Sequence, residues 1–494
     1  MINLVLIEKN IFTYGVIISI GTGVVTLQGF LMAFIGEVFR ICSSNLISTS
    51  YGVIVNLYRD DTMNLLIGAL LINQEDRISH GYCVKAISRL AVVILGDFMI
   101  GSIVDPMGNV IFNNTRIDVQ YPWLINAPAP GIILRQAVTE AMQTGILSID
   151  AMIPIGRGQR KLIVGDRQTG KTSIGVDTIL NQKYGTLFSV YIAIGQKASS
   201  VLQIFLSMIK RDATFYLTVV IAAASCTAVS QYLCAYSGTA MSEFFTMTGE
   251  LASFQILDDL SRHAIAYREI YLLLRTPPGR EAYPGEVFFV HARLLERSAK
   301  LSRSLGSGSL TSFPVIETLA GDVSAYITTN VISITDGQVF LSTDLFIAGI
   351  KPSIDVGLSV SRVGSTAHWE SIKLVSGSYK LELAQFVELQ SFSQFVSDLR
   401  DETRNRISRG IRLIEMLKQP SGSPMSLDQQ VGILTFANQD ILRTLSERGI
   451  RTYVNSYLAI PTWMKLLVPA RLLGCSIVQY ITHGYKLIEL AHLT

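Results

Sequence analysis

Charged side chains are scarce in this sequence, since Asp, Glu, Lys and Arg together make up 16% of its 494 residues. An average soluble protein contains about 25%. The formal net charge is only +3, so the composition does not indicate a nucleic-acid partner. So little charge favours either membrane spans or large interfaces with other proteins. A chain of this length exceeds one hydrophobic core, and roughly two to four domains are expected.

Cysteines are few and scattered along the chain. The sequence has no Cys-x-x-Cys pair and no Cys/His cluster, which argues against a zinc site and indicates reduced thiols in a reducing compartment. Residues 1–10 contain no basic region and no Arg/Ser-rich presequence, so we expect the chain to work in the compartment where it is made. The five cysteines are Cys42, Cys83, Cys226, Cys234 and Cys475.

Long hydrophobic runs are present but interrupted. Residues 10–36 carry no charge, and 15–36 have the length of a transmembrane helix. Interrupting glycines and a predominance of Ile and Val are more typical of strands broken by turns, with a membrane span as the alternative. Residues 463–485 are apolar too, but charged side chains divide them into pieces too short to cross a bilayer. A packed helical bundle is the favoured interpretation of this second segment.

Short apolar runs with different periodicities divide the chain. Runs at 52–58, 65–72 and 84–94, separated by polar turns, predict a small β-barrel. The proline-rich stretch 122–131 is interpreted as an ordered linker. From Lys380 onward, apolar residues recur every three or four positions and predict amphipathic helices. The first includes Phe395 and Leu399, and a second covers about 402–418.

One stretch combines a strand, a glycine-rich loop and a helix start. Residues 162–164 are apolar, the motif Gly-x-x-x-x-Gly-Lys-Thr follows at 165–172, and 173–180 can continue as a helix. In this pattern backbone N–H groups and the helix N-terminus face a polyphosphate, while the lysine neutralises the terminal phosphates. The predicted nucleotide-binding residues are Gly165, Asp166, Arg167, Gln168, Thr169, Gly170, Lys171 and Thr172.

A P-loop ATPase also needs a second carboxylate at the end of a neighbouring strand. Asp258 follows the apolar run 253–257, so Thr172 and Asp258 are the predicted Mg²⁺ residues, with Asp258 acting through water. An Asp-Asp pair after a strand is also a common helix cap. Gln196 follows the next apolar run, at the place where RecA-like ATPases have a glutamate. An amide orients water but cannot accept its proton, so we predict a site that holds nucleotide without turning it over.

The expected fold is therefore multidomain. We predict an N-terminal β-barrel over residues 1–90, a central α/β RecA-like P-loop nucleotide-binding domain over 91–370, and a C-terminal α-helical bundle over 371–494.

Several further motifs resemble the alpha subunit of F-type ATP synthase. The resemblance is dense over residues 126–419, and Ala-Ser-Ser at 198–200 is more similar to plastid and cyanobacterial versions than to mitochondrial ones. The motifs that carry it, besides the P-loop, are Gly-Arg-Gly-Gln-Arg at 156–160, Ala-Ile-Gly-Gln-Lys at 193–197, Pro-Pro-Gly-Arg-Glu-Ala-Tyr-Pro-Gly at 277–285, Ser-Ala-Tyr at 324–326, Asn-Val-Ile-Ser-Ile-Thr-Asp-Gly at 330–337, Val-Ser-Arg-Val-Gly at 360–364 and Lys-Leu-Glu-Leu-Ala-Gln-Phe at 380–386.

The resemblance implies specific roles for residues outside the P-loop. It implies bound MgATP, or ADP with Mg²⁺, that is not turned over. Phe346, Lys351 and Gln419 would lie near the base or the ribose. Arg362 would act in trans as an arginine finger, reaching into the catalytic site of a neighbouring subunit. Lys351 stands where this family usually has Arg, and Ser421 where it has a second base-contacting Gln.

The resemblance also implies partners and a location. The partners are beta subunits in an alternating ring of three alpha and three beta chains, the gamma central stalk, and peripheral-stalk subunits including delta. A proton-conducting membrane sector would be contacted indirectly. The implied location is peripheral, on the stromal side of a plastid thylakoid membrane, with a bacterial or mitochondrial inner membrane as alternatives. Similarity to the family nearly vanishes after Ser426.

Two other functional interpretations stay open at this point. A self-sufficient hexameric P-loop ATPase, such as an export motor or a RecA-like translocase, would need a carboxylate near position 196. An integral membrane protein is suggested by the low charge alone. Permanent interfaces within a ring of subunits explain the same low charge without any membrane span.

Overall fold

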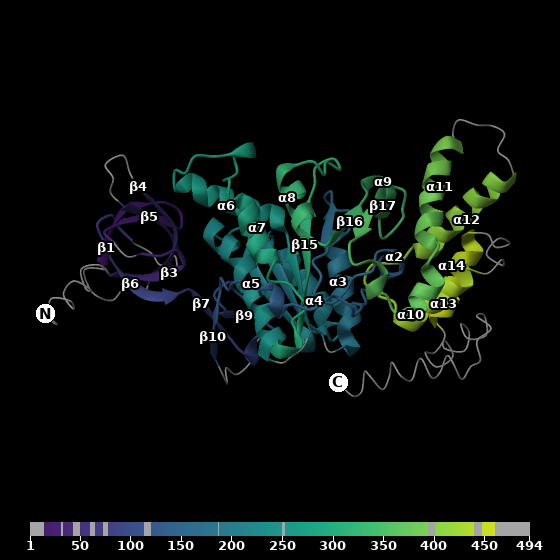
Figure 1. Cartoon of the computed structure of the whole chain (residues 1–494), viewed down its shortest axis with the longest axis horizontal. Helices are drawn as coiled ribbons and strands as arrows, with labels where there is room; N and C mark the ends of the chain where they lie inside the picture. Colours follow the sequence, from purple (N-terminus) through teal and green to yellow (C-terminus); the bar gives the residue numbers. More distant parts are fainter. Residues whose placement is uncertain are drawn as a thin grey trace.

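Three bodies follow one another along the long axis of the molecule: a β-barrel, an α/β body and a group of helices (Figure 1). The structure is a computed structural model that describes residues 14–30, 33–42, 50–59, 65–72, 78–112, 120–185, 187–248, 252–393, 401–438 and 447–459. Phe395, Leu399, Cys475 and the apolar segment 463–485 lie outside these ranges. The predicted fold class, with its barrel, nucleotide-binding α/β domain and helical bundle, is confirmed.

The barrel is closed, with six antiparallel strands in the order β1-β2-β5-β4-β3-β6. Closure leaves no strand edge open to pairing with other chains. Alternate residues point inward, and Ile17, Phe39 and Ile54 are fully buried there. The strands are β1 (Tyr14–Ile20), β2 (Val24–Gln28), β3 (Glu37–Cys42), β4 (Tyr51–Arg59), β5 (Leu65–Leu71) and β6 (Cys83–Leu90).

The described part of the uncharged N-terminal run contains the strands β1 and β2, as predicted. Among the described residues, no helix combines the length and the apolar character needed to cross a membrane.

The segment after the barrel differs from the prediction in two ways. The single run expected at 84–94 is divided between β6 in the barrel and β7 (Val92–Leu95), which belongs to a separate two-stranded sheet. Its partner is β10 (Tyr121–Leu124), so the first part of the proline-rich linker is a strand and the linker interpretation of it was wrong. Pro122 lies opposite Ile94 and lacks a backbone N–H, which an edge strand tolerates because one side of it needs no ladder hydrogen bonds.

A nine-stranded sheet forms the centre of the α/β body, in the order β17-β16-β11-β15-β14-β12-β13-β8-β9. The strands from β16 to β8 are parallel, and the edge strands β17 and β9 are antiparallel to their neighbours. The carboxyl ends of the parallel strands therefore share one edge of the sheet. The strands are β8 (Ile103–Val104), β9 (Val110–Phe112), β11 (Leu162–Gly165), β12 (Leu187–Gln196), β13 (Leu217–Ala223), β14 (Ala252–Asp258), β15 (Ser309–Glu317), β16 (Gly337–Leu341) and β17 (Ile354–Ser361).

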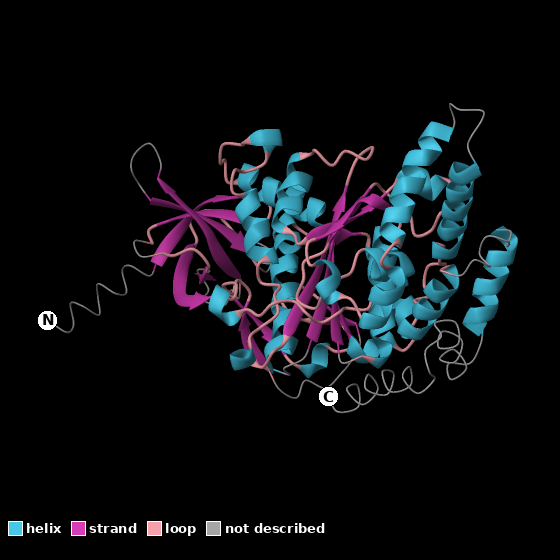
Figure 2. Cartoon of the chain, turned by 45° about the vertical axis from the view of Figure 1, so that its right-hand side comes forward, coloured by secondary structure: helices cyan, strands magenta, loops and turns pink. Residues whose placement is uncertain are grey.

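Both faces of this sheet are covered, as continuous apolar strands require (Figure 2). Along β12, Tyr191 and Ala193 belong to one core, while Val190 and Ile192 belong to the other. One core continues into the C-terminal helices and the other continues into the barrel. The covering helices are α2 (Leu147–Met152), α3 (Lys171–Asn181), α4 (Ala198–Ile209), α5 (Ala228–Thr248), α6 (Leu260–Leu273), α7 (Val287–Leu295), α8 (Tyr326–Ile334) and α9 (Thr343–Ile347).

Short 3₁₀ turns connect several of these elements. They are η1 (Asp97–Met99), η2 (Ile132–Leu134), η3 (Gln182–Tyr184), η4 (Ala213–Tyr216), η5 (Arg280–Ala282), η6 (Arg303–Leu305) and η7 (Gly364–Ala367).

A buried ion pair ties α5 to the segment after α7. Arg297 donates to both carboxylate oxygens of Glu243, at 2.7 and 2.6 Å, and also to the carbonyl of Ile125 at 2.8 Å. The exposed fractions of the two side chains are 0% and 6%. A planar guanidinium that satisfies a carboxylate bidentately is the geometry in which a buried pair is tolerated.

The C-terminal body is helical, as predicted. It consists of α10 (Glu370–Ser376), α11 (Tyr379–Ser393), α12 (Asp401–Leu417), α13 (Leu427–Ala437) and α14 (Glu447–Ala459). Gly410 lets α12 approach α11 closely, since a Cβ there would lie 2.2 Å from the ring of Phe386. Ser426 and Gln429 form a capping box at the start of α13.

Candidate functional site

The P-loop joins an inner strand of the central sheet to a helix. β11 ends at Gly165 and α3 begins at Lys171. A Cβ on Gly165 would lie 2.8 Å from the carbonyl oxygen of Leu341 on β16, so no side chain fits there. Gly170 precedes α3 with φ 98°, a left-handed conformation that favours glycine. The glycines therefore stand where the backbone must curl to bring its N–H groups toward a phosphate.

Asp166 holds the loop in place from inside the protein. One carboxylate oxygen accepts hydrogen bonds from the Thr318 hydroxyl at 2.7 Å and the Gly321 N–H at 2.9 Å. The other accepts from the Thr343 hydroxyl at 2.9 Å. Burial opposes ionisation, but these hydrogen bonds prevail and lower the pKa of Asp166. The carboxylate thus positions the loop, and contact of its side chain with nucleotide stays a prediction.

Lys171 lies at the mouth of the loop. Its ammonium donates to the carbonyl oxygens of Gly165, at 2.8 Å, and Asp166, at 2.5 Å. Burial lowers the pKa of Lys171, while nearby carboxylates, Glu317 first among them, oppose this effect. Both contacts are to carbonyls of the P-loop, so the ammonium is held beside the loop. In this motif the lysine neutralises the charge of the phosphates from that position.

Glu317 is a carboxylate beside the P-loop that the sequence did not single out. It is the last residue of β15, the strand next to β11, and its side chain pairs with Arg167. A signal existed, since a carboxylate ending an apolar strand is the pattern that identified Asp258. The strand 309–317 was missed because Ser and Thr interrupt its apolar run.

The predicted Mg²⁺ residues meet at the carboxyl end of β14. The Thr172 hydroxyl donates to one oxygen of Asp258 at 2.9 Å, and the Tyr191 hydroxyl donates to the same oxygen at 2.8 Å. Burial, reinforced by the charge of Asp258, raises the pKa of the adjacent Asp259 to about 6. A hydroxyl and a carboxylate at this distance are the oxygen donors that Mg²⁺ takes in P-loop sites, so the residues present fit this ion.

A cavity of about 230 Å³ opens beside the P-loop. It brings Phe346, Lys351 and Gln419, which are far apart in the chain, to Gln168, Thr169 and Gly170 of the loop. The ammonium of Lys351 lies 4.8 Å from the centre of the Phe346 ring, a cation–π contact. This arrangement suits a purine stacked near an aromatic ring, with its phosphates directed to the loop.

Gln419 lines the cavity, but its amide already has backbone partners. Its nitrogen donates to the carbonyls of Gly145, at 2.8 Å, and Ser423, at 2.6 Å, and its oxygen accepts from the Leu147 N–H at 3.2 Å. The residue is 5% exposed. Gln419 therefore shapes the wall of the cavity, and its contact with a base remains a prediction that would require exchanging one of these bonds.

Other residues of the cavity wall were not predicted. Asp177 is one of them: it accepts a hydrogen bond from the Gly422 N–H at 2.7 Å, and burial raises its pKa to about 6. Ser353 donates to the Thr169 carbonyl at 3.0 Å. Three of the lining residues, Ser173, Ile174 and Asp177, follow Lys171 on α3, so helical periodicity starting at this lysine could have identified them. The unpredicted lining residues are Ile146, Ser173, Ile174, Asp177, Pro352 and Ser353, and Ser421 lines the cavity as the resemblance implied.

Arg362 lies away from this site. It follows β17, which runs antiparallel to β16, and its N–H donates to the Asp336 carbonyl at 3.0 Å, at the start of β16. The P-loop begins at the opposite end of β11. It is therefore separated from Arg362 by the length of several strand residues, at ~3.3 Å each. The side chain of Arg362 is exposed, and no ion pair to it occurs within the described ranges. It is thus unsuited to the phosphates of its own P-loop.

Comparison with known protein families decides the assignment. Residues 145–361 match the nucleotide-binding domain of the ATP synthase alpha/beta family, and residues 369–462 match the C-terminal domain of the ATP synthase alpha/beta chain. Together the two segments make up more than half of the sequence. The chain belongs to the ATP synthase alpha/beta family. It is therefore a nucleotide-binding subunit of a rotary ATP synthase or of a related P-loop ATPase, and it assembles with other subunits.

In this ATP synthase alpha/beta chain, the backbone that carries Arg362 is held on four successive residues. Lys380 donates to the Ser359 carbonyl at 3.1 Å, and Lys161 donates to the Val360 carbonyl at 2.7 Å. The hydroxyl of Ser361 donates to the carbonyl of Pro154 at 2.7 Å. With the bond from Arg362 to Asp336, these contacts anchor the end of β17 to α11, to the segment before β11 and to the start of β16, and they limit the motion of the backbone that carries the arginine.

Lys161 predicts a pH dependence of stability. It is completely buried, and burial, helped by the charge of Lys380 and opposed by Asp336, lowers its pKa to about 7. An unfolded lysine has a pKa of about 10.4. Between these values the unfolded chain binds more protons, so this residue makes stability rise with pH from about 7 to about 10. Denaturant midpoints measured over this range should rise for the natural chain relative to Lys161→Met; parallel pH curves would contradict the prediction.

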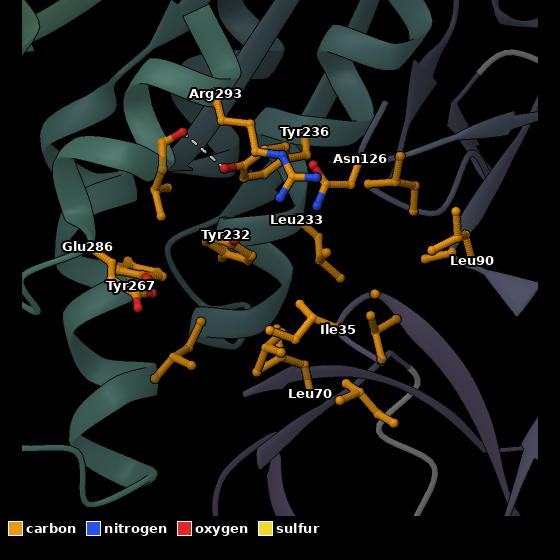
Figure 3. Close-up of a pocket in the computed structure, with 18 of the residues that line it drawn as sticks. Ile35, Leu70, Leu90, Asn126, Tyr232, Leu233, Tyr236, Tyr267, Glu286 and Arg293 are labelled. Carbon is orange, nitrogen blue, oxygen red and sulfur yellow. Dashed lines mark hydrogen bonds between the residues drawn. The ribbon is translucent and has the colours of Figure 1, made fainter. Parts of the chain in front are cut away.

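A second cavity, of about 600 Å³, lies where the barrel meets the central domain (Figure 3). The barrel contributes aliphatic side chains such as Leu70, and the helices contribute aromatic ones such as Tyr232 and Tyr267. Glu286 and Arg293 are charged residues at its wall. None of the predicted nucleotide-binding residues lines this cavity, so it is separate from the P-loop site of this ATP synthase alpha/beta family member.

Proposed function

We propose that this family member is the alpha-type, non-catalytic subunit of a proton-translocating rotary F-type ATP synthase. It would hold a nucleotide without turning it over and lend Arg362 to the catalytic site of an adjacent beta subunit. Arg362 carries the proposal, because an exposed guanidinium without an ion pair among the described residues, at the end of the sheet opposite its own P-loop, is free to act on a neighbour.

Gln196 supports the non-catalytic part of the proposal. It ends β12, and its amide donates to the main-chain carbonyl of Asp258 at 3.3 Å. The residue therefore lies beside the metal end of the site, where a general base would have to stand. An amide cannot take a proton from an attacking water, which leaves hydrolysis at this site without its base.

Most of the predicted residues would have a task in binding MgATP or MgADP. The backbone N–H groups of the loop and the Lys171 ammonium would bind the phosphates. Thr172 would ligate Mg²⁺ directly and Asp258 through water; the ion, when bound, neutralises phosphate charge. Phe346 and Lys351 would contact the base or the ribose. A lysine here keeps the positive charge of the usual arginine and loses its planar stacking surface.

The proposed partners follow from this role. They are beta subunits, alternating with three copies of this chain in a ring, the gamma central stalk, and peripheral-stalk subunits including delta. The proposed location is peripheral, on the stromal side of a thylakoid membrane, or on a bacterial or mitochondrial inner membrane. Exposed apolar side chains support an interface with other subunits. The exposed fraction of Ile132 is 91%, and that of Ile133 is 92%.

Nucleotide retention by the purified chain tests the proposal. We expect stable binding of MgATP with no steady release of phosphate. Lys171→Ala should weaken binding by roughly 10–100-fold, because a hydrogen bond to a charged group contributes about 1.5–3 kcal/mol. Equilibrium binding of a fluorescent ATP analogue measures this, with the exposed Lys210→Ala as the matched control. Steady turnover by the lone chain would contradict the non-catalytic role.

One observation favours a second candidate, a self-sufficient hexameric P-loop ATPase. Glu317 places a carboxylate beside the P-loop, where it could act as a base if Arg167 released it. Phosphate release by the purified chain that disappears in Glu317→Gln would identify this function. The same turnover unaffected by Glu317→Gln would contradict both readings of the site.

A further inference from the structure

Two of the cysteines lie directly opposite each other on the barrel. Cys42 ends β3, Cys83 begins β6, and the antiparallel register pairs these two residues with each other. Their neighbours Ile41 and Val84 are both 0% exposed and point into the barrel. Because side chains alternate along a strand, both thiols lie on the outer face. Cys83 is exposed, Cys42 is partly exposed, and both are free thiols.

The backbone at this position suits a disulfide. Residues directly opposite in antiparallel strands have Cα atoms roughly 4.5–5.5 Å apart, and disulfides join Cα atoms roughly 4.4–6.8 Å apart. Because the two residues are already register partners in the β3–β6 ladder, neither strand has to move to reach this geometry. Rotation of two side chains is sufficient to bring the sulfurs together.

The other described cysteines differ in ways that make them internal controls. Cys234 is fully buried in α5, its thiol donates weakly to the Ala193 carbonyl at 3.6 Å, and burial raises its pKa strongly. Cys226 is exposed in the turn after β13. Its nearest thiol along the chain, Cys234, is inaccessible to reagents. Only Cys42 and Cys83, among the described residues, combine exposure with an opposing thiol.

We propose that Cys42 and Cys83 form a vicinal dithiol on the barrel, a redox-modification site that reacts with a small-molecule disulfide such as oxidised glutathione. The thiolate of Cys83 attacks one sulfur of oxidised glutathione, and one glutathione leaves as a thiolate that takes up the proton. The thiolate of Cys42 then attacks the Cys83 sulfur and releases the second glutathione. Two protein thiols are oxidised to one disulfide, and one oxidised glutathione is reduced to two thiols.

The cross-link would change the stability of the barrel. It joins β3 to β6 and closes a loop that contains β4 and β5. Closing this loop restricts the unfolded chain, so the oxidised barrel should unfold at a temperature several degrees higher than the reduced barrel. Reduction restores two free thiols and the original midpoint, which makes the site a reversible switch.

Oxidation of the full chain in glutathione buffers tests the proposal. After mixed disulfides with glutathione are counted separately, a protein disulfide should account for two of the five thiols, and peptide mapping should show Cys42 linked to Cys83. Cys42→Ser should stop at a mixed disulfide on Cys83, whereas Cys226→Ser should behave like the natural chain. Five remaining thiols, or a link that includes Cys226, Cys234 or Cys475, would overturn the proposal.

A trivalent arsenical gives an independent readout that requires no oxidation. Phenylarsine oxide should bind one equivalent per chain, resist a monothiol and be removed by a dithiol. Binding should be lost in Cys42→Ser and in Cys83→Ser, and it should persist in Cys226→Ser. Circular dichroism of each variant confirms folding. Monothiol-sensitive binding, or binding that survives both barrel substitutions, would show that the two thiols do not act together.

Discussion

Replacing Arg362 with alanine should lower ATP hydrolysis by the assembled complex roughly 10³–10⁵-fold, the range that arginine fingers contribute. The physical reason is that, in the proposed role, the variant loses a positive charge that would stabilise the transferring phosphoryl group on the partner chain. Because residues 359–362 are anchored by hydrogen bonds, little backbone freedom would be lost when the arginine engages. Steady-state phosphate release by the complex reconstituted with its catalytic partner measures the effect.

The controls for this variant separate catalysis from assembly. Nucleotide binding by the chain itself should not change, because Arg362 lies at the other end of the sheet from the P-loop. Arg362→Lys should recover only part of the rate, since an ammonium lacks the planar fork. The exposed Arg303→Ala should leave turnover unchanged. If Arg362→Ala complexes assemble and hydrolyse ATP at the natural rate, the role in trans is wrong.

The second large effect concerns stability. Glu243→Gln or Arg297→Met should each destabilise the central domain by about 3–5 kcal/mol, because either change leaves one buried charge without its partner. Arg297→Met also removes the donor to the Ile125 carbonyl. The double change Glu243→Leu with Arg297→Met should recover much of the loss, since a buried ion pair and a packed apolar pair often have similar stability.

Urea unfolding followed by tryptophan fluorescence suits this measurement. Trp123 makes an edge contact with Phe244, the residue next to Glu243, with 5.8 Å between the rings, so its emission reports on this region. The exposed pair Arg406–Glu402 on α12 is the matched control, and Arg406→Ala should cost at most about 0.5 kcal/mol. Equal losses in the exposed and buried variants would show that burial of the charges does not decide the outcome.

Sequence patterns were sufficient where neighbouring residues act together. The P-loop could be predicted because its strand, its glycines and its helix start are contiguous. Asp258 could be placed because the carboxyl ends of parallel strands meet at one edge. Gln419 shows the limit: only the family resemblance implied a place for it at the site, and its amide bonds to backbone from distant segments. The strand that contains Pro122 was missed because proline usually argues against a strand; here it lies in an edge strand, one side of which needs no N–H.

By itself, the sequence determined the three-part architecture and the phosphate loop, since periodicity and short motifs depend on residues close along the chain, and it paired Thr172 with Asp258 because parallel strands end at one edge of a sheet. Only the tertiary structure decided the wall of the nucleotide cavity, the contact of Lys161 with the strand that carries Arg362, and the opposition of Cys42 to Cys83. Each of these depends on strand order and register. Register is set by cooperative packing of the whole core, which no local pattern contains.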